Sequence, residues 1–403
     1  MGGYRSESSA IKFAGVTVAG ILFCHCYLGV AWWQMCLWGG AALFILRQIA
    51  AGADCKSLQR KTNLHGKVAI VTGANAGIGY YTALQLAEMG ALVIITCRNV
   101  PLTQQTGDRL RTEAAARRFC KAVRIIDDYC LECDDFASIQ KFVAGFLSDT
   151  RVMLRPDATA QLDILVNNAG MMLKALQFSK HQPRLEMHTA VNFLGPVLLT
   201  ELLMPTVKRS GGRVVNVASH AHQLPMSVPK LGPANLLDAL VAGNAGADAS
   251  RGLLAAGSKG ASPGILTGIR TAFLRYGTSK LMNIYYSHYI AATHGVAVCS
   301  LHPGGVSTQF VRDLVPTWCV PVVDRLLFFC KTCEEGAQTS VYCAICPVAE
   351  LAVVVPERVS PYFVECRNQT REMLGSFGWS TEAAMRIVTD FALKELAPYL
   401  NTK

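Results

Sequence analysis

The chain has 403 residues, of which 51% are hydrophobic and 16% are charged. This balance excludes an intrinsically disordered protein and leaves room for one large α/β domain with additions. Lysine and arginine outnumber aspartate and glutamate by 38 to 28, and the resulting formal charge of +10 suits anionic membrane surfaces or phosphorylated cofactors. Because the chain has no arginine-rich run and no aromatic RNA motif, no nucleic-acid partner is expected.

The 15 cysteines follow no repeating framework, which in a large domain indicates reduced thiols and a cytosolic setting. The pairs Cys330/Cys333 and Cys343/Cys346 have the spacing of zinc ligands. A helix is expected to begin between the pairs, however, so small side chains in a helical core are the favoured interpretation. No metal site is predicted.

Residues 13–46 form a run of 34 residues without a formal charge, which predicts a membrane anchor. One straight helix of this length would span about 51 Å, against a hydrocarbon core of roughly 30 Å. We therefore expect the run to tilt, to form a hairpin or to bend in the interface near Trp32, Trp33 and Trp38. A cleavable signal peptide is the alternative, although its apolar region is usually only about 7 to 15 residues long.

The basic residues around this run predict its orientation. Arg47, Lys56, Arg60 and Lys61 follow the run, whereas only two basic residues of the N-terminal tail precede it. This asymmetry favours a cytosolic domain anchored to the endoplasmic reticulum or to a lipid droplet. Asn368 begins the only N-glycosylation sequon, which would stay unmodified in the cytosol and would be accessible to modification in the lumen.

A β-branched run at 67–71 predicts a buried parallel strand that leads into a glycine-rich turn and then into a helical pattern up to Gly90. Such glycines let the backbone approach a pyrophosphate, while the N-terminus of the helix supplies free N–H groups. A second strand at 91–96 completes the pattern, and we predict a doubly wound α/β fold with a parallel sheet. The candidate phosphate-binding residues are Gly73, Asn75, Gly77, Ile78 and Gly79.

Arg98 follows the second strand, where an NAD-selective site usually carries an acid. Arginine can pair with the 2′-phosphate of NADP, so NADP(H) is favoured over NAD(H), with a solvated strand-end arginine as the alternative. Asp135, after the third strand region, is a candidate for a hydrogen bond to the adenine. Spacing alone does not separate this role from Asp134.

Two later strands, at 162–166 and 296–301, also run into small residues and side-chain amides. Small residues at these strand ends would let a cofactor lie close to the backbone, although a structural turn is equally compatible with the first of them. The candidate cofactor-binding residues are Asn167, Ala169, Gly170, Pro303, Gly304 and Val306.

Tyr276 and Lys280 are four residues apart, which puts a phenol and an ammonium on one face of a helix. An ammonium in that position can lower the pKa of the phenol and make it a proton donor or acceptor near neutral pH. Alone, the pair is also compatible with an exposed aromatic beside a solvated lysine. A strand at 213–218 delivers Ser219 at its carboxyl end, where ligands lie in doubly wound sheets.

Taken together, these segments resemble the short-chain dehydrogenase/reductase superfamily over about residues 63–350. The resemblance rests on the glycine-rich turn, on Asn167-Asn-Ala-Gly170, on Ser219, on Tyr276 with Lys280, and on His302-Pro-Gly304, in the family's order. It implies that Ser219 holds the substrate oxygen, that Tyr276 exchanges a proton with it, and that Lys280 lowers the pKa of Tyr276 and binds the nicotinamide ribose. Asn192 resembles the residue that holds a water in the proton relay, with a locally satisfied helix amide as the alternative.

The anchor, Cys97-Arg98-Asn99 and Asn192-Phe-Leu-Gly195 resemble the membrane-bound retinol dehydrogenase and polyprenol dehydrogenase group. The resemblance implies hydride transfer between NADP(H) and a hydrophobic alcohol, aldehyde or ketone such as a retinoid or polyprenoid. The alternatives are a steroid or fatty-carbonyl reductase of the same mechanism and a non-catalytic nucleotide-binding membrane protein. The expected partners are a hydrophobic small molecule and membrane lipid, and a homodimer is left open.

This interpretation divides the chain into a tail (1–12), the anchor (13–46), a basic linker (47–66), a catalytic domain (67–350) and a C-terminal substrate-side extension with a helix (351–403). Ser219 and Tyr276 are 57 residues apart, longer than in the proteins it resembles, so 221–272 contains an insertion. Between 242 and 264, 16 of 23 residues are Gly, Ala or Ser, typical of a flexible surface loop. It could cover the substrate mouth or have no catalytic consequence.

Overall fold

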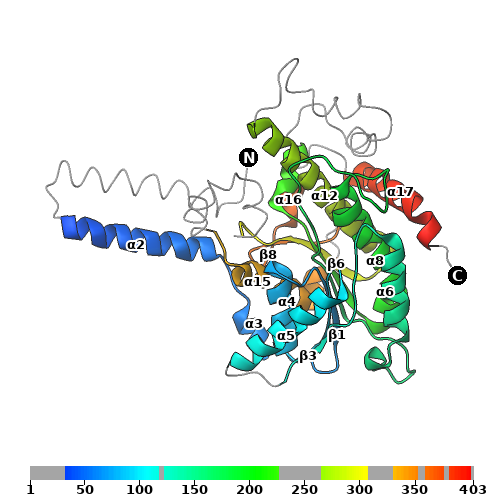
Figure 1. Cartoon of the computed structure of the whole chain (residues 1–403). Helices are drawn as coiled ribbons and strands as arrows, with labels where there is room; N and C mark the ends of the chain where they lie inside the picture. Colours follow the sequence, from blue (N-terminus) through cyan, green and yellow to red (C-terminus); the bar gives the residue numbers. More distant parts are fainter. Residues whose placement is uncertain are drawn as a thin grey trace, which may run out of the picture.

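Side chains of the first strand alternate between two hydrophobic layers. Val68 and Ile70 pack into one buried cluster, and Ala69 and Val71 pack into the other. Because successive side chains of a strand point to opposite faces, a strand that is apolar at every position must lie between two covering layers. The computed structural model, which describes residues 32–117, 122–226, 265–306, 330–352, 359–375 and 381–400, has this arrangement (Figure 1).

The sheet has eight strands in the order β3-β2-β1-β4-β5-β6-β7-β8. All neighbours pair in parallel except β7 and β8, which pair antiparallel. The strand order reverses between β1 and β4, which makes this the switch point where ligands bind in doubly wound sheets. The strands are β1 (Val68–Thr72), β2 (Leu92–Thr96), β3 (Arg124–Ile126), β4 (Ile164–Asn167), β5 (Arg213–Val217), β6 (Ala297–His302), β7 (Tyr362–Val364) and β8 (Arg367–Asn368).

Two layers of helices cover the sheet. One layer is α4 (Gly77–Glu88), α5 (Val100–Ala116) and α15 (Cys333–Ile345); the other is α6 (Phe136–Ser148), α8 (Gly195–Ser210), α12 (Ile265–Thr293) and α17 (Thr381–Leu400). The shorter helices are α3 (Lys56–Lys61), η1 (Thr150–Val152), α7 (Met187–Thr189), η2 (Ala190–Leu194), η3 (His220–His222), α9 (Gln223–Met226), η7 (Val348–Leu351) and α16 (Thr370–Gly375).

The predicted doubly wound fold is confirmed, and the five expected strands lie within two residues of their predicted bounds. The C-terminal segment differs from the expected extension, because β7 pairs with β6 and β8 closes a hairpin on β7. Residues beyond 350 therefore complete the sheet of the domain. The substrate-side stretch 309–329 and most of the expected insertion, 227–264, lie outside the described residues.

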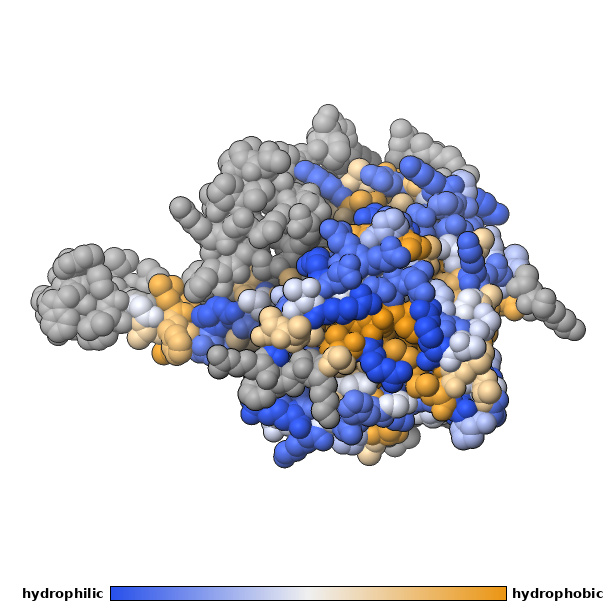
Figure 2. Space-filling view, turned by 60° about the horizontal axis from the view of Figure 1, so that its bottom comes forward, coloured by the Kyte–Doolittle hydropathy of each residue, from blue (hydrophilic) through white to orange (hydrophobic). Residues whose placement is uncertain are grey.

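The described part of the anchor is a helix that extends away from the domain, α2 (Trp32–Ala51) (Figure 1). Within the described residues the helix is not broken at Trp33 or Trp38, since α2 is continuous from Trp32 to Ala51 and enters the linker. Leu43, Phe44 and Ile45 are 49%, 65% and 45% exposed, and Figure 2 shows apolar side chains on this projecting helix. Residues 13–31 of the anchor lie outside the described residues.

Within the described ranges one helix is long and apolar enough to cross a membrane, Met187–Ser210, and Gly40–Ala51 of α2 is a shorter apolar helix. The Met187–Ser210 helix comprises α7, η2 and α8, and 78% of its apolar window is buried inside the domain. Its apolar face packs with α6 and α17 in the main hydrophobic cluster, as expected for a core helix.

Gly195 lets this core helix pass close to the loop before α6. A Cβ atom at Gly195 would lie 2.3 Å from the backbone oxygen of Cys133, which is too close for any real contact. A backbone atom cannot move aside as the end of a flexible side chain can, so the helix itself would have to shift.

We expect Gly195→Ala to lower the free energy of unfolding by about 1–3 kcal/mol, because overpacking outweighs the gain in helix propensity. Chemical denaturation of the full chain in detergent would measure the change. Gly40→Ala is the control, since a Cβ atom there would meet nothing within 4 Å. Equal unfolding midpoints for the two variants would contradict the packing argument.

Candidate active site

The glycine-rich turn after β1 is closed against the segment after β4. A Cβ atom at Gly73 would lie 2.8 Å from the Cα atom of Ala169, and one at Gly79 would lie 2.5 Å from the oxygen of Gly73. The Thr72 hydroxyl accepts hydrogen bonds from the amides of Asn168 (3.1 Å) and Ala169 (3.0 Å). Only glycine allows these close approaches, so the two strand ends form one surface.

The outer side of this turn is open. Gly77 has a φ of +63°, begins α4, and has nothing within 4 Å of a Cβ position. The backbone amides at a helix N-terminus attract an anion, and an open backbone without side chains gives it room. Asn75 and Ile78 lie to either side: the Asn75 carbonyl accepts a 3.4 Å bond from Arg109, and Ile78 packs against Gly336 of α15. The predicted phosphate-binding turn thus fits a pyrophosphate.

Asn167 and Asn168 have separate roles. The Asn167 amide is buried and donates to the Thr200 hydroxyl (2.9 Å) and the Asn216 oxygen (2.8 Å), which ties β4 to α8 and β5. Its side chain therefore lies in the core instead of on the predicted cofactor surface. Asn168 serves the turn, because its amide donates to the oxygens of Thr72 (2.9 Å) and Gly73 (3.2 Å).

Tyr276, on α12, meets Ser219, which follows β5. Packing away from water raises the pKa of Tyr276 to about 12, and the side-chain hydrogen bond with Ser219 acts in the opposite direction. The Ser219 hydroxyl also accepts a 3.2 Å bond from the amide of Ala221 and so caps η3. The structure thus joins two hydroxyl groups that are 57 residues apart in the chain.

Lys280 lies one turn further along α12 and is 3% exposed. Its ammonium donates a 2.8 Å hydrogen bond to the carbonyl of Val217 and lies 5.8 Å from the centre of the Tyr276 ring. Burial lowers the pKa of Lys280 to about 8, partly offset by the Cys133 thiol. Desolvation is the larger influence on the pKa of Tyr276 in this structure, and the lowering of that pKa by Lys280 stays a prediction.

Gly170 brings the end of β4 next to this lysine. A Cβ atom at Gly170 would lie 3.2 Å from the Lys280 ammonium and 3.4 Å from the Asn192 side-chain oxygen. Gly170, Asn192 and Lys280 therefore converge at one point, as the sequence interpretation requires.

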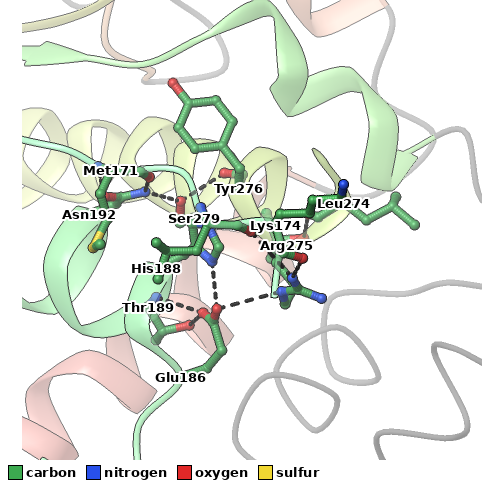
Figure 3. Close-up of polar contacts among 12 residues, drawn as sticks. Met171, Lys174, Glu186, His188, Thr189, Asn192, Leu274, Arg275, Tyr276 and Ser279 are labelled. Atoms are coloured by element: carbon green, nitrogen blue, oxygen red, sulfur yellow. Dashed lines mark hydrogen bonds and ion pairs between the residues drawn. The ribbon is translucent and has the colours of Figure 1, made fainter. Parts of the chain in front are cut away.

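Asn192 is fully buried in η2, a single π-helical turn of the kind often found at functional sites. Its side-chain oxygen accepts from the Met171 amide (2.7 Å), and its nitrogen donates to the Met171 carbonyl (2.8 Å) and the Ser279 hydroxyl (3.1 Å) (Figure 3). Its backbone oxygen accepts a 2.8 Å bond from Asn283. The side chain of Asn192 thus holds the loop after Gly170 against α12.

A buried group that the sequence did not reveal supports the same loop (Figure 3). Glu186 lies 2.5 Å from Nδ1 of His188, and Nε2 of His188 accepts a 2.9 Å bond from the Leu173 amide. Arg275, the neighbour of Tyr276, donates to the Lys174 carbonyl (2.9 Å) and lies 3.7 Å from Glu186. Glu-x-His is no recognised signal, and Arg275 is distant in sequence, so only the fold could reveal this group.

A hydrogen bond between two histidines joins the ends of β5 and β6. Nδ1 of His302 accepts a 3.1 Å hydrogen bond from the amide of His220, immediately after Ser219. Burial, together with the charges of His220, His222 and Lys331, moves the pKa of His302 well below its usual value. His302 is therefore neutral at physiological pH and fixes the Ser219 loop as a hydrogen-bond acceptor.

At the ends of β2 and β3, where the adenine half of a cofactor is expected, the chain carries Arg98 and the acids Glu132, Asp134 and Asp135. Arg98 is exposed between β2 and α5. The Asp135 carboxylate caps α6 by accepting from the amides of Ala137 and Ser138, and Asp134 accepts a 2.7 Å bond from the Ser179 hydroxyl.

Both candidate aspartates are therefore already engaged in local structure. Glu132, which the sequence analysis passed over, follows Leu131, whose amide donates a 2.8 Å bond to the Cys97 carbonyl at the end of β2. Its carboxylate lies 3.8 Å from His181. Glu132 thus lies at the strand end where an adenine contact is expected.

After β6, Pro303 and Gly304 begin the loop predicted to lie against the nicotinamide, and Gly304 has a φ of +92°. Val306 forms an isolated parallel bridge with Lys331 and packs against Gly336 of α15. The loop therefore lies between the end of β6 and the beginning of α15. Residues 307 and 308 lie outside the described residues.

Comparison with known proteins supports this arrangement. A family model described as short chain dehydrogenase matches residues 67–229. Retinol dehydrogenase 11 from Homo sapiens is 33% identical over 310 residues, which cover 76% of this chain and 80% of that protein. Retinol dehydrogenase 12 from Bos taurus is 33% identical over 328 residues, with coverage of 80% and 84%. Dehydrogenase/reductase SDR family member 13 from Bos taurus is 29% identical over 311 residues, with coverage of 76% and 68%.

The family match covers the glycine-rich turn and the strands from β1 to β5. With 33% identity to a retinol dehydrogenase over most of both chains, this protein is an oxidoreductase that belongs to the short-chain dehydrogenase/reductase family.

Proposed function

We propose that this protein is a membrane-anchored enzyme that transfers hydride between NADP(H) and a hydrophobic alcohol/carbonyl pair, with a retinoid or polyprenoid as the leading substrate class. The observation that carries the proposal is the hydrogen bond between Ser219 and Tyr276, with Lys280 one helical turn away. Two converging hydroxyl groups can bind one substrate oxygen from two sides. The names of the retinol dehydrogenase relatives support the substrate class.

When bound, the cofactor supplies or accepts the hydride at its nicotinamide ring. Tyr276 holds a proton at neutral pH, since the surrounding protein raises the pKa of its phenol to about 12. A neutral phenol suits proton donation to a carbonyl oxygen that gains charge as hydride arrives. Ser219 orients that oxygen, and the charged Lys280 lies close enough to stabilise a developing phenolate.

The cofactor would lie across the carboxyl edge of the sheet. The N-terminus of α4 at Gly77 would hold the pyrophosphate, and the loops at Gly170 and Gly304 would border the nicotinamide half. Arg98 would pair with the 2′-phosphate of NADP, and Glu132 replaces Asp135 as our candidate for the adenine contact. The exposed apolar side chains of α2 support anchoring in a membrane of the endoplasmic reticulum or a lipid droplet.

Tyr276→Phe removes the proton donor and leaves the ring in place. We expect turnover of long-chain aldehydes and retinal in isolated membranes to fall by at least about 100-fold, with NADPH binding retained. Tyr289→Phe, on the same helix, is the matched control and should leave turnover unchanged. Undiminished turnover by the Tyr276 variant would remove the catalytic assignment.

Arg98→Asp replaces the proposed phosphate partner with a like charge. We expect the ratio of NADPH to NADH affinity to fall by about 10- to 100-fold, since a charged hydrogen bond is lost. Binding titrations with both cofactors measure this ratio, and Arg371→Asp, an exposed position on α16, serves as the control. An unchanged ratio would show that another residue selects the cofactor.

Asn368 is exposed on β8 and therefore accessible to a glycosyltransferase if the domain faces the lumen. With the domain in the cytosol, we expect no glycan at this position. Glycosidase treatment of the protein from cells should leave its mobility unchanged and identical to that of Asn368→Gln. A glycosidase-sensitive form present only in the unsubstituted protein would place the domain in the lumen.

A further inference from the structure

The linker between α2 and the domain is bound to the hairpin that ends the sheet. The amide of Ala53 donates a 2.7 Å hydrogen bond to Oε2 of Glu365, and Gly52 has a φ of +70°. A Cβ atom at Gly52 would lie 2.0 Å from the same carboxylate oxygen and 2.6 Å from the Lys331 ammonium. Only glycine can bring the linker this close to the Glu365–Lys331 pair.

The same pair reaches the proposed nicotinamide loop. Lys331 is 2% exposed, and its ammonium lies 2.6 Å from Oε1 of Glu365. The stem of Lys331 packs on Gly304, where a Cβ atom would lie 2.8 Å from Cε of the lysine. The backbone amide of Lys331 donates a 2.8 Å hydrogen bond to the carbonyl of Gly305. Lys331 therefore contacts the loop through both its backbone and its side chain.

The backbone at Glu365 is unusual. Glu365 and Cys366 have φ values of +52° and +55° in the turn between β7 and β8. A two-residue turn of this type normally uses Asn and Gly, because a side chain disfavours the left-handed region. Backbone strain of this kind points to a constraint from function. Here the strained turn directs one carboxylate to both the linker and Lys331.

We propose that Glu365 and Lys331 are positioning residues that couple the linker after α2 to the nicotinamide loop, so that the affinity for the cofactor depends on how the linker is docked. The proposal rests on the proposed function, which places the cofactor against Gly304. A buried ion pair whose partners also contact two other segments restricts both segments at once, since moving either segment would leave a charge buried without its partner. The pair itself does not touch the reacting atoms.

Gly52→Ala tests the coupling with a matched control. The new methyl group would collide with the Glu365 carboxylate and displace the linker, while Gly66→Ala introduces the same residue at a similar φ of +76° with nothing within 4 Å. We expect Gly52→Ala to weaken NADPH binding about tenfold relative to Gly66→Ala and to raise KM for NADPH with little change in kcat.

Hydrogen exchange of the cofactor-free full chain in detergent provides a readout independent of catalysis. Exchange in peptides that cover 302–306 and 330–335 should be faster in Gly52→Ala than in Gly66→Ala. Glu365→Gln, which keeps an acceptor for Ala53 but removes the charge opposite Lys331, should show the same two changes relative to the exposed control Glu372→Gln. This variant decides the question if Gly52→Ala does not fold.

Binding and exchange separate the two proposals. If the unsubstituted protein binds neither NADPH nor NADH, the proposed function fails, and the exchange comparison still tests the coupling. If the variants match their controls in both binding and exchange, the coupling is wrong while the proposed function stands. Faster exchange in the loop peptides of Gly52→Ala or Glu365→Gln supports the coupling.

Discussion

The hydrogen bond from Lys280 to the carbonyl of Val217 holds the catalytic helix α12 against the carboxyl end of β5. With that contact in place, the side chain of Tyr276 reaches Ser219. The two hydroxyl groups meet although a long segment separates them in the chain. A buried ammonium is costly unless its hydrogen bonds are made, so this contact strongly restricts the position of the helix. The geometry of the site follows from it.

A second constraint comes from close backbone approaches. Gly73 and Gly170 bring the ends of β1 and β4 against each other and against Lys280, with no room for a side chain. Around these contacts, Asn192 and the Glu186–His188–Arg275 group fix the loop after Gly170 by hydrogen bonds to its backbone. The loop is thus held at Met171, Leu173 and Lys174, which preorganises the site before any ligand binds.

Two segments far apart in the chain also meet at the edge of the sheet. The linker after α2 contacts the β7–β8 hairpin, and Arg47 at the end of α2 forms a 2.7 Å ion pair with Glu335 at the beginning of α15. The helix with exposed apolar side chains therefore has a defined attachment to the domain and is not connected to it by the chain alone. In the proposed membrane-bound enzyme, this attachment would fix the direction of the carboxyl edge of the sheet relative to α2.

The sequence by itself predicted the doubly wound fold, which the structure confirms, and it named Gly73, Ser219, Tyr276 and Lys280 as candidate site residues, because strand periodicity, glycine turns and helical spacing are local properties of the chain. It did not reveal the core role of Asn167, the capping role of Asp135, or the Glu186–His188–Arg275 and Lys331–Glu365 groups. Those roles depend on which side of a turn a side chain faces and on contacts between residues far apart in sequence. Only tertiary packing, which sets the desolvation of Tyr276 and Lys280 as well, could decide them.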